Sequence, residues 1–258
     1  MIDWLEILDF TKTIAREAGR IVLETYNQDL YVEHKGRVDL VTEADKASED
    51  WLKRVIFSRF SHHTILAEES SYTGDSSDFL WIIDPLDGTT NYAHSFPMFC
   101  ISIALQYQNE TRLAVIFDPL RNEIFSAILG NGAYLNDKKI HVSKTDKLLE
   151  SLLGTGFPYI PNTAFHRNFA LFHKIYPQTQ GIRRGGSAAL DLAYTACGRF
   201  DGFWEFDLKP WDCAAGMLLI EEAGGLCTQS NGDPASAFIP DICASNGLIH
   251  AALLENFR

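Results

Sequence analysis

Residues 79–92 read Phe-Leu-Trp-Ile-Ile-Asp-Pro-Leu-Asp-Gly-Thr-Thr-Asn-Tyr. The apolar first part is rich in β-branched and aromatic side chains, which predicts a buried strand that ends at Asp84. A proline and an Asp-Gly pair then predict a turn, and Thr89 can begin a helix. Carboxylates such as Asp84 and Asp87 supply the oxygen ligands that Mg²⁺ prefers, and free N–H groups at a helix start attract phosphate. The competing interpretation is a buried strand followed by an ordinary Asp-Gly turn.

The length and composition are those of a globular protein. The chain has 258 residues, of which 46% are hydrophobic and 22% are charged. This length fits one large domain or two closely packed halves. The net charge of −12 argues against a broad nucleic-acid surface, which needs a basic face. It suits a protein that gathers carboxylates around cations, although a solvated acidic surface gives the same total.

The five cysteines point to a reducing compartment. They are widely spaced, odd in number, and none form a Cys-x-x-Cys pair. This pattern indicates reduced thiols in a cytoplasmic protein rather than disulfides or a zinc site. The amino terminus lacks the basic and apolar regions of a signal peptide, and no apolar run reaches the ~20 residues that span a bilayer. We therefore expect a cytoplasmic protein without a membrane segment.

Hydrophobic spacing divides the chain into two differently built halves. In the first half, the pattern predicts helices at about 3–26 and from Thr42 onward, a short strand at 64–67, and strands at 99–107, 112–118 and 122–129. That order indicates two helices against a mainly antiparallel sheet. The second half alternates helices and strands, which indicates an α/β layer. The predicted helices are 166–175, 187–198, 211–223 and 247–256, and the predicted strands are 180–184, 201–206, 225–229 and 238–244.

Four acidic clusters border these predicted elements. They contain Asp45, the pair Glu68-Glu69, Asp84 with Asp87, and Asp212. Asp45 and Asp212 each fall in the first turn of a predicted helix, where a negative charge also pairs favourably with the helix dipole. The spacing alone does not show whether the four clusters meet.

Two long segments resemble the signatures of the inositol monophosphatase family. Residues 81–92 are similar to its first signature, and residues 211–225, Trp-Asp-Cys-Ala-Ala-Gly-Met-Leu-Leu-Ile-Glu-Glu-Ala-Gly-Gly, to its second. The resemblance continues through 38–45, 68–70 and 183–189 and spans about residues 35–247. Two signatures in the right order are a specific signal. The resemblance implies a layered αβαβα fold of the α+β and α/β classes in one domain over 1–258. The halves would be approximately 1–145 and 146–258, with the active site between them.

The resemblance also implies a Mg²⁺-dependent phosphomonoesterase that is sensitive to lithium. Glu68, Asp84 and the backbone carbonyl of Leu86 would bind one Mg²⁺. Asp84, Asp87 and Asp212 would bind a second, with Asp84 bridging, and a third, weaker ion would lie near Glu68. Paired cations neutralise the anionic phosphate and stabilise the departing alkoxide, which are the two obstacles to hydrolysis of a phosphate ester.

The implied catalytic residues are Asp45, Glu68 and Thr89. A metal-activated water would attack the phosphorus, with Thr89 and Asp45 as a hydrogen-bonded pair that orients and deprotonates it, assisted by Glu68. The N–H groups of Gly88 and Thr89 would hold phosphate oxygens. Lys35 would be a basic partner nearby.

The implied contacts to the substrate's alcohol come mainly from the second half. They are Arg183, Gly186, Ser187, Ala188 and Glu205, together with the metal ligands Asp87 and Asp212. Ser187 replaces the family's usual threonine and keeps a hydroxyl group. Arg184, the neighbour of Arg183, fits an ordinary surface charge equally well.

We interpret the sequence as that of a phosphatase acting on myo-inositol 1-phosphate, a small phosphorylated polyol. A homodimer is the family's usual state, and no direct nucleic-acid or membrane partner is expected. The alternatives are phosphatases for histidinol phosphate, fructose 1,6-bisphosphate or a 3′-phosphoadenosine nucleotide. A further alternative is a bacterial protein that acts chiefly as a partner in ribosomal RNA transcription complexes.

Overall fold

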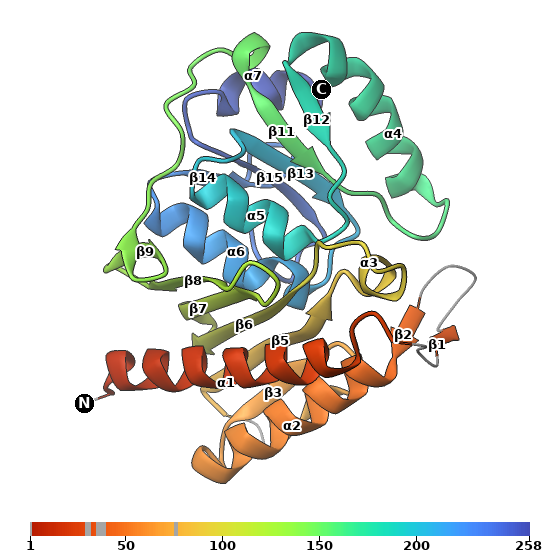
Figure 1. Ribbon diagram of the computed structural model, residues 1–258. Coiled ribbons are helices and arrows are strands. Elements are labelled where there is room, and N and C mark those ends of the chain that lie inside the picture. The colour runs from red at the N-terminus through yellow and green to blue at the C-terminus, as the bar shows by residue number, and fades with distance from the viewer. Residues whose placement is uncertain (1, 29–31, 35–39, 75–76) are drawn as a thin grey trace.

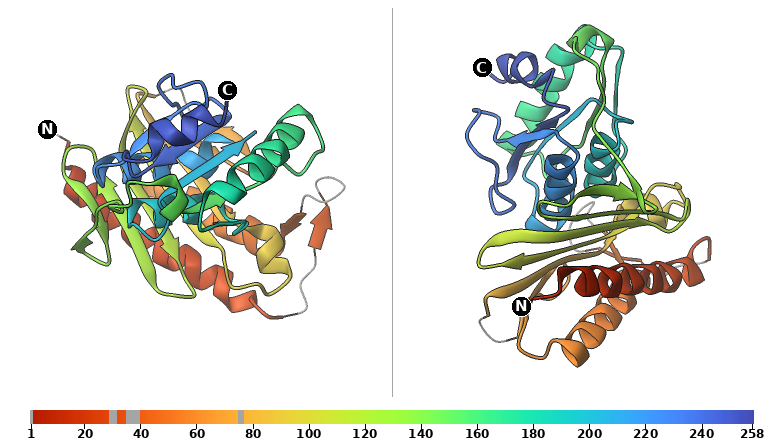
Figure 2. Two further views of the ribbon diagram at one scale, coloured as in Figure 1. Left: turned by 90° about the horizontal axis from the view of Figure 1, so that it is seen from above. Right: turned by 90° about the vertical axis from the view of Figure 1, so that its left-hand side faces the viewer.

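The computed structural model describes residues 2–28, 32–34, 40–74 and 77–258. Its helices and sheets are stacked in layers that alternate from one end of the molecule to the other (Figures 1 and 2). Helices α1 (Trp4–Thr25) and α2 (Glu43–Arg59) form the first layer, and a large sheet covers them. Helices α5 (Ala188–Ala196) and α6 (Pro210–Glu222) separate this sheet from a smaller one. Helices α4 (Thr163–Ile175) and α7 (His250–Glu255) form the last layer. The predicted αβαβα layering is confirmed.

Within the described residues, the large sheet has eight strands in the order β10-β9-β8-β7-β6-β5-β3-β4. All neighbours are antiparallel except β3 and β5, which run parallel. The strands are β3 (Thr64–Ala67), β4 (Ser71–Thr73), β5 (Phe79–Asp87), β6 (Cys100–Tyr107), β7 (Glu110–Asp118), β8 (Glu123–Ile128), β9 (Gly132–Leu135) and β10 (Lys138–Lys139). A separate hairpin joins β1 (Val32–His34) to β2 (Leu40–Thr42). The predicted antiparallel character of the first half is confirmed.

The smaller sheet is mixed, and its five described strands follow the order β12-β11-β13-β15-β14. Strand β11 (Leu152–Thr155) runs parallel to β12 (Gly181–Arg183) and β13 (Gly202–Phe206). Strand β15 (Asp241–Ser245) lies between β13 and β14 (Leu226–Thr228) and is antiparallel to both. The sequence Gly154-Thr155-Gly156 suggests a loop, but this prediction is wrong for Gly154 and Thr155, which lie in β11. Two 3₁₀ turns, η1 (Leu148–Glu150) and η2 (Tyr176–Gln178), complete this half.

The two faces of strand β6 in the large sheet differ in side-chain size. On β6, Ile101, Ile103 and Leu105 pack toward α1 and α2, whereas the alternate residues Cys100 and Ala104 pack toward α5 and α6. This is the two-residue alternation of a strand buried on both faces. Small side chains on the second face let the α5 and α6 layer approach closely, and that layer brings residues of the second half to the end of β5.

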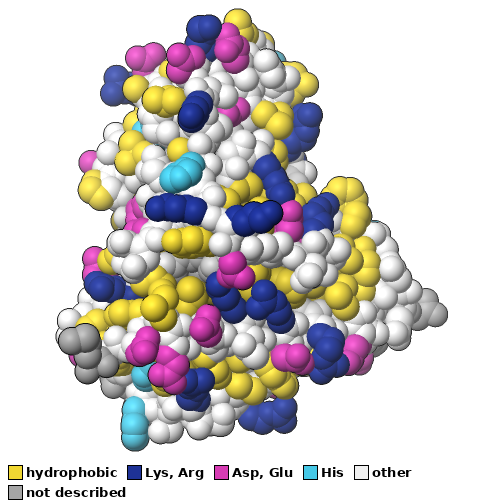
Figure 3. All heavy atoms as spheres, turned by 60° about the vertical axis from the view of Figure 1, so that its left-hand side comes forward, with side chains coloured by type: hydrophobic (Ala, Val, Ile, Leu, Met, Phe, Trp, Pro, Cys, Tyr) yellow, Lys and Arg dark blue, Asp and Glu magenta, His cyan; other side chains and the backbone are white. Residues whose placement is uncertain are grey.

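The surface carries charges of both signs. On the face shown in Figure 3, Lys and Arg side chains are interspersed with acidic and hydrophobic ones. All five cysteines are free thiols, and only Cys197 is more than slightly exposed. Among the described residues, no helix has the length and apolar character needed to cross a membrane.

Candidate active site

A bulge in strand β5 creates the centre of the site. Pairing with β6 is regular up to Asp84, opposite Ser102, and resumes only at Asp87, opposite Cys100. The strand therefore continues past Asp84, where the sequence predicted its end. The Leu86 backbone N–H donates to Asp84 Oδ1 at 3.0 Å, which fixes that carboxylate beside the bulge. An extra residue in one strand redirects the side chains that follow it.

Gly88 ends the bulge and caps the short helix α3 (Thr89–Ala93). Its φ of 97° lies in the left-handed region, which residues with a Cβ rarely adopt. A Cβ at this position would also lie 2.9 Å from the Met98 carbonyl oxygen. The predicted helix start at Thr89 is confirmed.

Asp87 is held by the beginning of helix α5. Its Oδ2 accepts hydrogen bonds from Ser187 Oγ at 2.6 Å and from the Ala189 backbone N–H at 2.8 Å. The Sγ of Cys100, 3.8 Å away, is a third and weaker donor. Helix N-termini favour negative charge, so α5 fixes the carboxylate of a residue in the other half of the chain.

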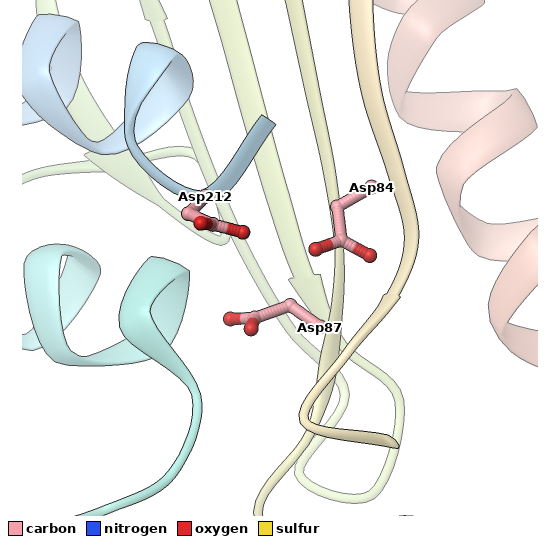
Figure 4. A group of neighbouring side chains, drawn as sticks. All are labelled: Asp84, Asp87 and Asp212. Atoms are coloured by element: carbon pink, nitrogen blue, oxygen red, sulfur yellow. The ribbon is translucent and has the colours of Figure 1, made fainter. Parts of the chain in front are cut away.

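Asp84, Asp87 and Asp212 converge from β5 and α6 (Figure 4). Each offers a carboxylate oxygen, and these oxygens all lie within 4.8 Å of one another. The Lys209 backbone N–H donates to Asp212 Oδ2 at 2.7 Å and orients that side chain at the start of α6. The question that spacing left open is thus answered for three of the predicted residues.

Burial raises the pKa of all three carboxyl groups. The pKa of Asp84 lies well above its ordinary value because of burial and then the charges of Glu68, Asp87 and Asp212. The pKa of Asp212 is also raised well above its usual range, by burial and then by Asp87. The pKa of Asp87 is raised by burial, against the opposing hydrogen bonds from Ser187 and Ala189. Such mutually repelling buried oxygens match the ligands of a hard divalent cation, so these residues fit Mg²⁺.

Glu68 stands at the edge of this group. It follows β3 and lines the same cavity as Asp87 and Asp212, and its charge is the second-largest influence on the pKa of Asp84. It does not belong to the three-carboxylate group found among the described residues. The structure therefore brings Glu68 to the site but at its periphery.

Asp45 and Thr89 form a buried hydrogen-bonded pair. Thr89 Oγ1 donates to Asp45 Oδ1 at 2.9 Å, and the Leu86 carbonyl oxygen is a second acceptor at 3.2 Å. Asp45 Oδ2 accepts from the backbone N–H of Thr42 at 2.8 Å and from its hydroxyl at 2.5 Å, so Asp45 also completes the capping box of α2. Burial raises the pKa of Asp45 to about 6. The helix-capping and functional interpretations of Asp45 are therefore compatible.

A cavity of about 600 Å³ opens beside these carboxylates. Predicted substrate residues that line it are Gly186, Ser187, Ala188 and Glu205, along with Asp87 and Asp212. Both Arg183 and Arg184 are exposed, but only Arg184 is among the residues that line the cavity. Neighbouring residues of an extended segment point to opposite sides, so only one of these two adjacent arginines faces the cavity. Lys35 lies outside the described residues.

The Glu205 carboxylate packs closely against the backbone of Gly156. A Cβ at position 156 would overlap this carboxylate, so a larger residue there would require the Glu205 side chain to shift. Burial raises the pKa of Glu205 to about 8. The segment 156–161, which continues from Gly156, forms a mostly apolar wall of the cavity. No motif in the sequence points to this wall or to Asp191, a further lining residue.

Comparisons with known proteins place this fold and site in a phosphatase family. Residues 3–258 match the inositol monophosphatase family, and the chain belongs to it. The inositol-1-monophosphatase of Synechocystis sp. is 43% identical over 254 residues, covering 98% of this chain and 88% of that protein. The Nus factor SuhB of Pseudomonas aeruginosa is 41% identical over 259 residues, covering 98% and 96%. The crystal structure of the suppressor protein SuhB of Bartonella henselae has a TM-score of 0.94 at 36% identity, covering 98% of both chains.

In the metal-free protein, the raised carboxyl pKa values predict stability that falls as the pH rises. A group whose pKa is higher in the folded state stabilises the fold below its unfolded pKa, and this contribution is lost as the pH passes the folded value. Those values are about 6 for Asp45 and about 8 for Glu205. In excess EDTA, we expect the Tm to fall by roughly 5–10 °C between pH 5 and pH 8.

Calorimetry in buffers of matched ionic strength checks this expectation. Millimolar Mg²⁺ at pH 8 should raise the Tm again, because a ligand that binds only the folded state stabilises it. A Tm that stays constant or rises between pH 5 and pH 8 in the absence of Ca²⁺ and Mg²⁺ would contradict the prediction.

Proposed function

We propose that the protein is a Mg²⁺-dependent phosphomonoesterase that hydrolyses myo-inositol 1-phosphate to inositol and phosphate. The observation that carries this proposal is the position of the Asp84, Asp87 and Asp212 carboxylates beside the Asp45–Thr89 pair, at one end of a cavity that both charged and apolar side chains line. Family membership supports phosphatase activity, and the family is generally dependent on Mg²⁺. The 43% identity to a cyanobacterial inositol-1-monophosphatase favours the inositol substrate.

Asp84, Asp87 and Asp212 would hold Mg²⁺, with Glu68 and the Leu86 carbonyl as further oxygen ligands. We propose two ions and a third, weaker one near Glu68. Bound Mg²⁺ supplies charge that draws electrons from the phosphoryl oxygens and stabilises the departing oxygen. The Leu86 carbonyl oxygen already lies in the bulge, 3.2 Å from Thr89 Oγ1.

The chain's own groups handle the proton of the attacking water. Thr89 Oγ1 would accept that proton while its own hydroxyl hydrogen passes to Asp45 Oδ1, 2.9 Å away. Thr42 holds Asp45 from the opposite side, so the acceptor does not rotate. Glu68, at the cavity edge, would assist in orienting the water. The backbone N–H groups of Gly88 and Thr89 would hold phosphate oxygens.

The alcohol part of the substrate would occupy the rest of the cavity. Ser187, Ala188 and Gly186 offer hydroxyl and backbone groups at the start of α5, and Glu205 offers a carboxyl group from β13. Of the two arginines, Arg184 is the one that lines the cavity and is the better candidate to contact the substrate. The proposed roles of Arg183 and Lys35 rest on the family resemblance alone.

A substrate panel tests the proposed function. We expect Mg²⁺-dependent phosphate release from myo-inositol 1-phosphate with a kcat/KM at least about tenfold above those for histidinol phosphate, fructose 1,6-bisphosphate and 3′-phosphoadenosine nucleotides. EDTA should abolish the release, and lithium should inhibit it. Faster hydrolysis of another member of the panel would overturn the substrate assignment, and no hydrolysis of any member would overturn the enzymatic one.

A second candidate role is that of a binding partner in ribosomal RNA transcription complexes. It is favoured by the 41% identity to a protein named Nus factor SuhB. The retained metal-binding carboxylates support catalysis as the main role, and the net charge of −12 argues against direct nucleic-acid binding. Rescue of a deletion strain by the Asp87→Asn variant would favour the binding role.

We also propose a homodimer in the cytoplasm. Exposed apolar side chains near the cavity mouth, among them Tyr159, Ile160 and Phe169, support an association surface. Sedimentation velocity across a range of protein concentrations would distinguish a monomer from a dimer.

A further inference from the structure

One carboxyl group in the cavity wall has an oxygen without a hydrogen-bond partner in the part of the chain that the structure describes. Asp191 lies in the first turn of α5, is 1% exposed and lines the substrate cavity. Its Oδ1 has no hydrogen-bond partner among the described residues. Buried polar atoms are nearly always paired, so an orphaned one in a cavity wall indicates a missing partner.

The charged groups nearest to Asp191 also line this cavity. Glu205 and then Asp87 raise the pKa of Asp191 after the effect of burial, whereas Arg184 lowers it. Among the described residues, no ion pair within 4 Å joins Arg184 to Asp191 or to Glu205. Asp191 from α5, Glu205 from β13 and Arg184 from the loop before α5 thus line one cavity without an ion pair between them. This arrangement leaves room for a group that pairs with several of them at once.

A purely structural role for Asp191 has to be distinguished from a binding role. A Cβ added to Gly185 would lie 2.6 Å from Asp191 Oδ1, so the carboxyl group sits directly against the 184–186 loop. The same loop is already held from its other side, because Asn91 Nδ2 donates to the Gly185 carbonyl oxygen at 2.9 Å. A weak hydrogen bond from the Gly185 backbone N–H also ties the Asp191 carboxyl group to this loop. This contact leaves Oδ1 without a partner, so a role in holding the loop does not by itself account for that oxygen.

We propose that Asp191 is a further substrate-binding residue, which together with Glu205 accepts hydrogen bonds from hydroxyl groups of the substrate's alcohol part. This inference rests on the proposed phosphomonoesterase function. It narrows the substrate class to phosphate esters of polyols whose hydroxyl groups reach beyond the ester carbon. A site built to pair with hydroxyl groups rejects alcohols that lack them, because the buried acceptors then remain unsatisfied.

Two esters with the same ring test this assignment, namely myo-inositol 1-phosphate and cyclohexyl phosphate. In the Asp191→Asn variant of the full chain with Mg²⁺, we expect the KM for inositol phosphate to rise about tenfold with kcat within about twofold. The KM for cyclohexyl phosphate, which has no hydroxyl groups, should stay within about twofold. Asp191→Ser, which removes more of the side chain, should give the same change in the ratio of the two KM values and serves if the Asn variant folds poorly.

Asp201→Asn provides the matched control. Asp201 is another largely buried acid, but its carboxylate is satisfied by Ser143 Oγ at 2.5 Å and the Leu152 N–H at 2.7 Å, and it does not line the cavity. The Asp201→Asn variant should leave the ratio of the KM values for the two esters unchanged. Equal KM changes for both esters, or no change for either, in the Asp191 variants would refute the role of Asp191 while leaving phosphatase activity intact. Failure of the unmodified protein to hydrolyse myo-inositol 1-phosphate would refute the proposed function, and this inference with it.

Discussion

Replacing Asp212 by Asn is expected to lower kcat for inositol phosphate by at least about 100-fold at saturating Mg²⁺. The substitution removes one of three carboxylates that meet within 4.8 Å, and each tenfold of rate corresponds to about 1.4 kcal/mol of lost transition-state stabilisation. The fold should survive. Because the pKa of Asp212 is raised well above its usual range, loss of its charge relieves repulsion from Asp87. We therefore expect the metal-free variant to have a higher Tm at pH 8 than the unmodified protein.

The control for this variant is Asp3→Asn. Asp3 also caps a helix, accepting from the backbone N–H groups of Leu5 and Glu6 at 3.1 Å, and it is remote from the cavity. If Asp212 only stabilised the start of α6, both substitutions would have the same small effect. Steady-state kinetics and calorimetry with and without Mg²⁺ distinguish a metal-binding role of Asp212 from a purely structural one. An unchanged kcat for Asp212→Asn at saturating Mg²⁺ would contradict the assignment of Asp212 to the metal site.

Removing either member of the Asp45–Thr89 pair is expected to have the second large effect on kcat. Asp45→Asn and Thr89→Ala should each lower kcat by about 10²–10⁴-fold, the usual contribution of a positioned proton acceptor. Because the two side chains act as one unit through a 2.9 Å hydrogen bond, the double variant should be little worse than either single one. The KM for substrate and the Mg²⁺ concentration for half-maximal rate should change by less than about threefold.

Thr89→Ser retains the hydroxyl group and should keep at least about a tenth of the activity. Asn at position 45 can still accept the Thr42 N–H through its side-chain oxygen, so the start of α2 should persist, as circular dichroism can verify. If the loss of kcat in the double variant equals the product of the two single losses, the residues act independently. That result would contradict the proposed proton transfer.

Elements with strong periodicity were predictable from the sequence. The expected helix at 3–26 is α1, Trp4–Thr25, and the strands expected at 99–107 and 112–118 are β6 and β7 with ends shifted by one or two residues. These segments carry long apolar patterns that only one type of element can bury. The second helix was also correctly predicted to begin at Thr42, which is its N-cap residue.

Strand β11 was not predictable from its own composition. It is short and contains Gly154, a residue that weakens strands and suggests a loop. Tertiary packing also favours glycine there, because a Cβ would lie 3.1 Å from the Phe200 ring and the ring would have to shift. Likewise, alternation of helices and strands indicated an α/β layer but could not show that β15 would be antiparallel to both neighbours. Tertiary packing decides such cases, and a single sequence does not encode it in a local pattern.

The candidate site was predictable in its residues but not in its geometry. Acidic residues at element ends were visible, yet only the family resemblance connected Asp84 to Asp212, which come from different layers of the fold. Asp191 gave no signal, because an acid in the first turn of a helix is ordinary. The sequence did not favour Arg184 over Arg183, because the backbone conformation after β12 decides which of the two adjacent residues lines the cavity.

The place of β15 in the smaller sheet has a consequence for biosynthesis. This strand lies between β13 and β14, although it follows both of them in the chain. While the polypeptide is emerging from the ribosome, β13 cannot acquire its neighbour on that side, and Glu205 on β13 stays unshielded, until residues 241–245 have been translated. A nascent chain arrested before this point should therefore be sensitive to protease in its second half and unable to release phosphate.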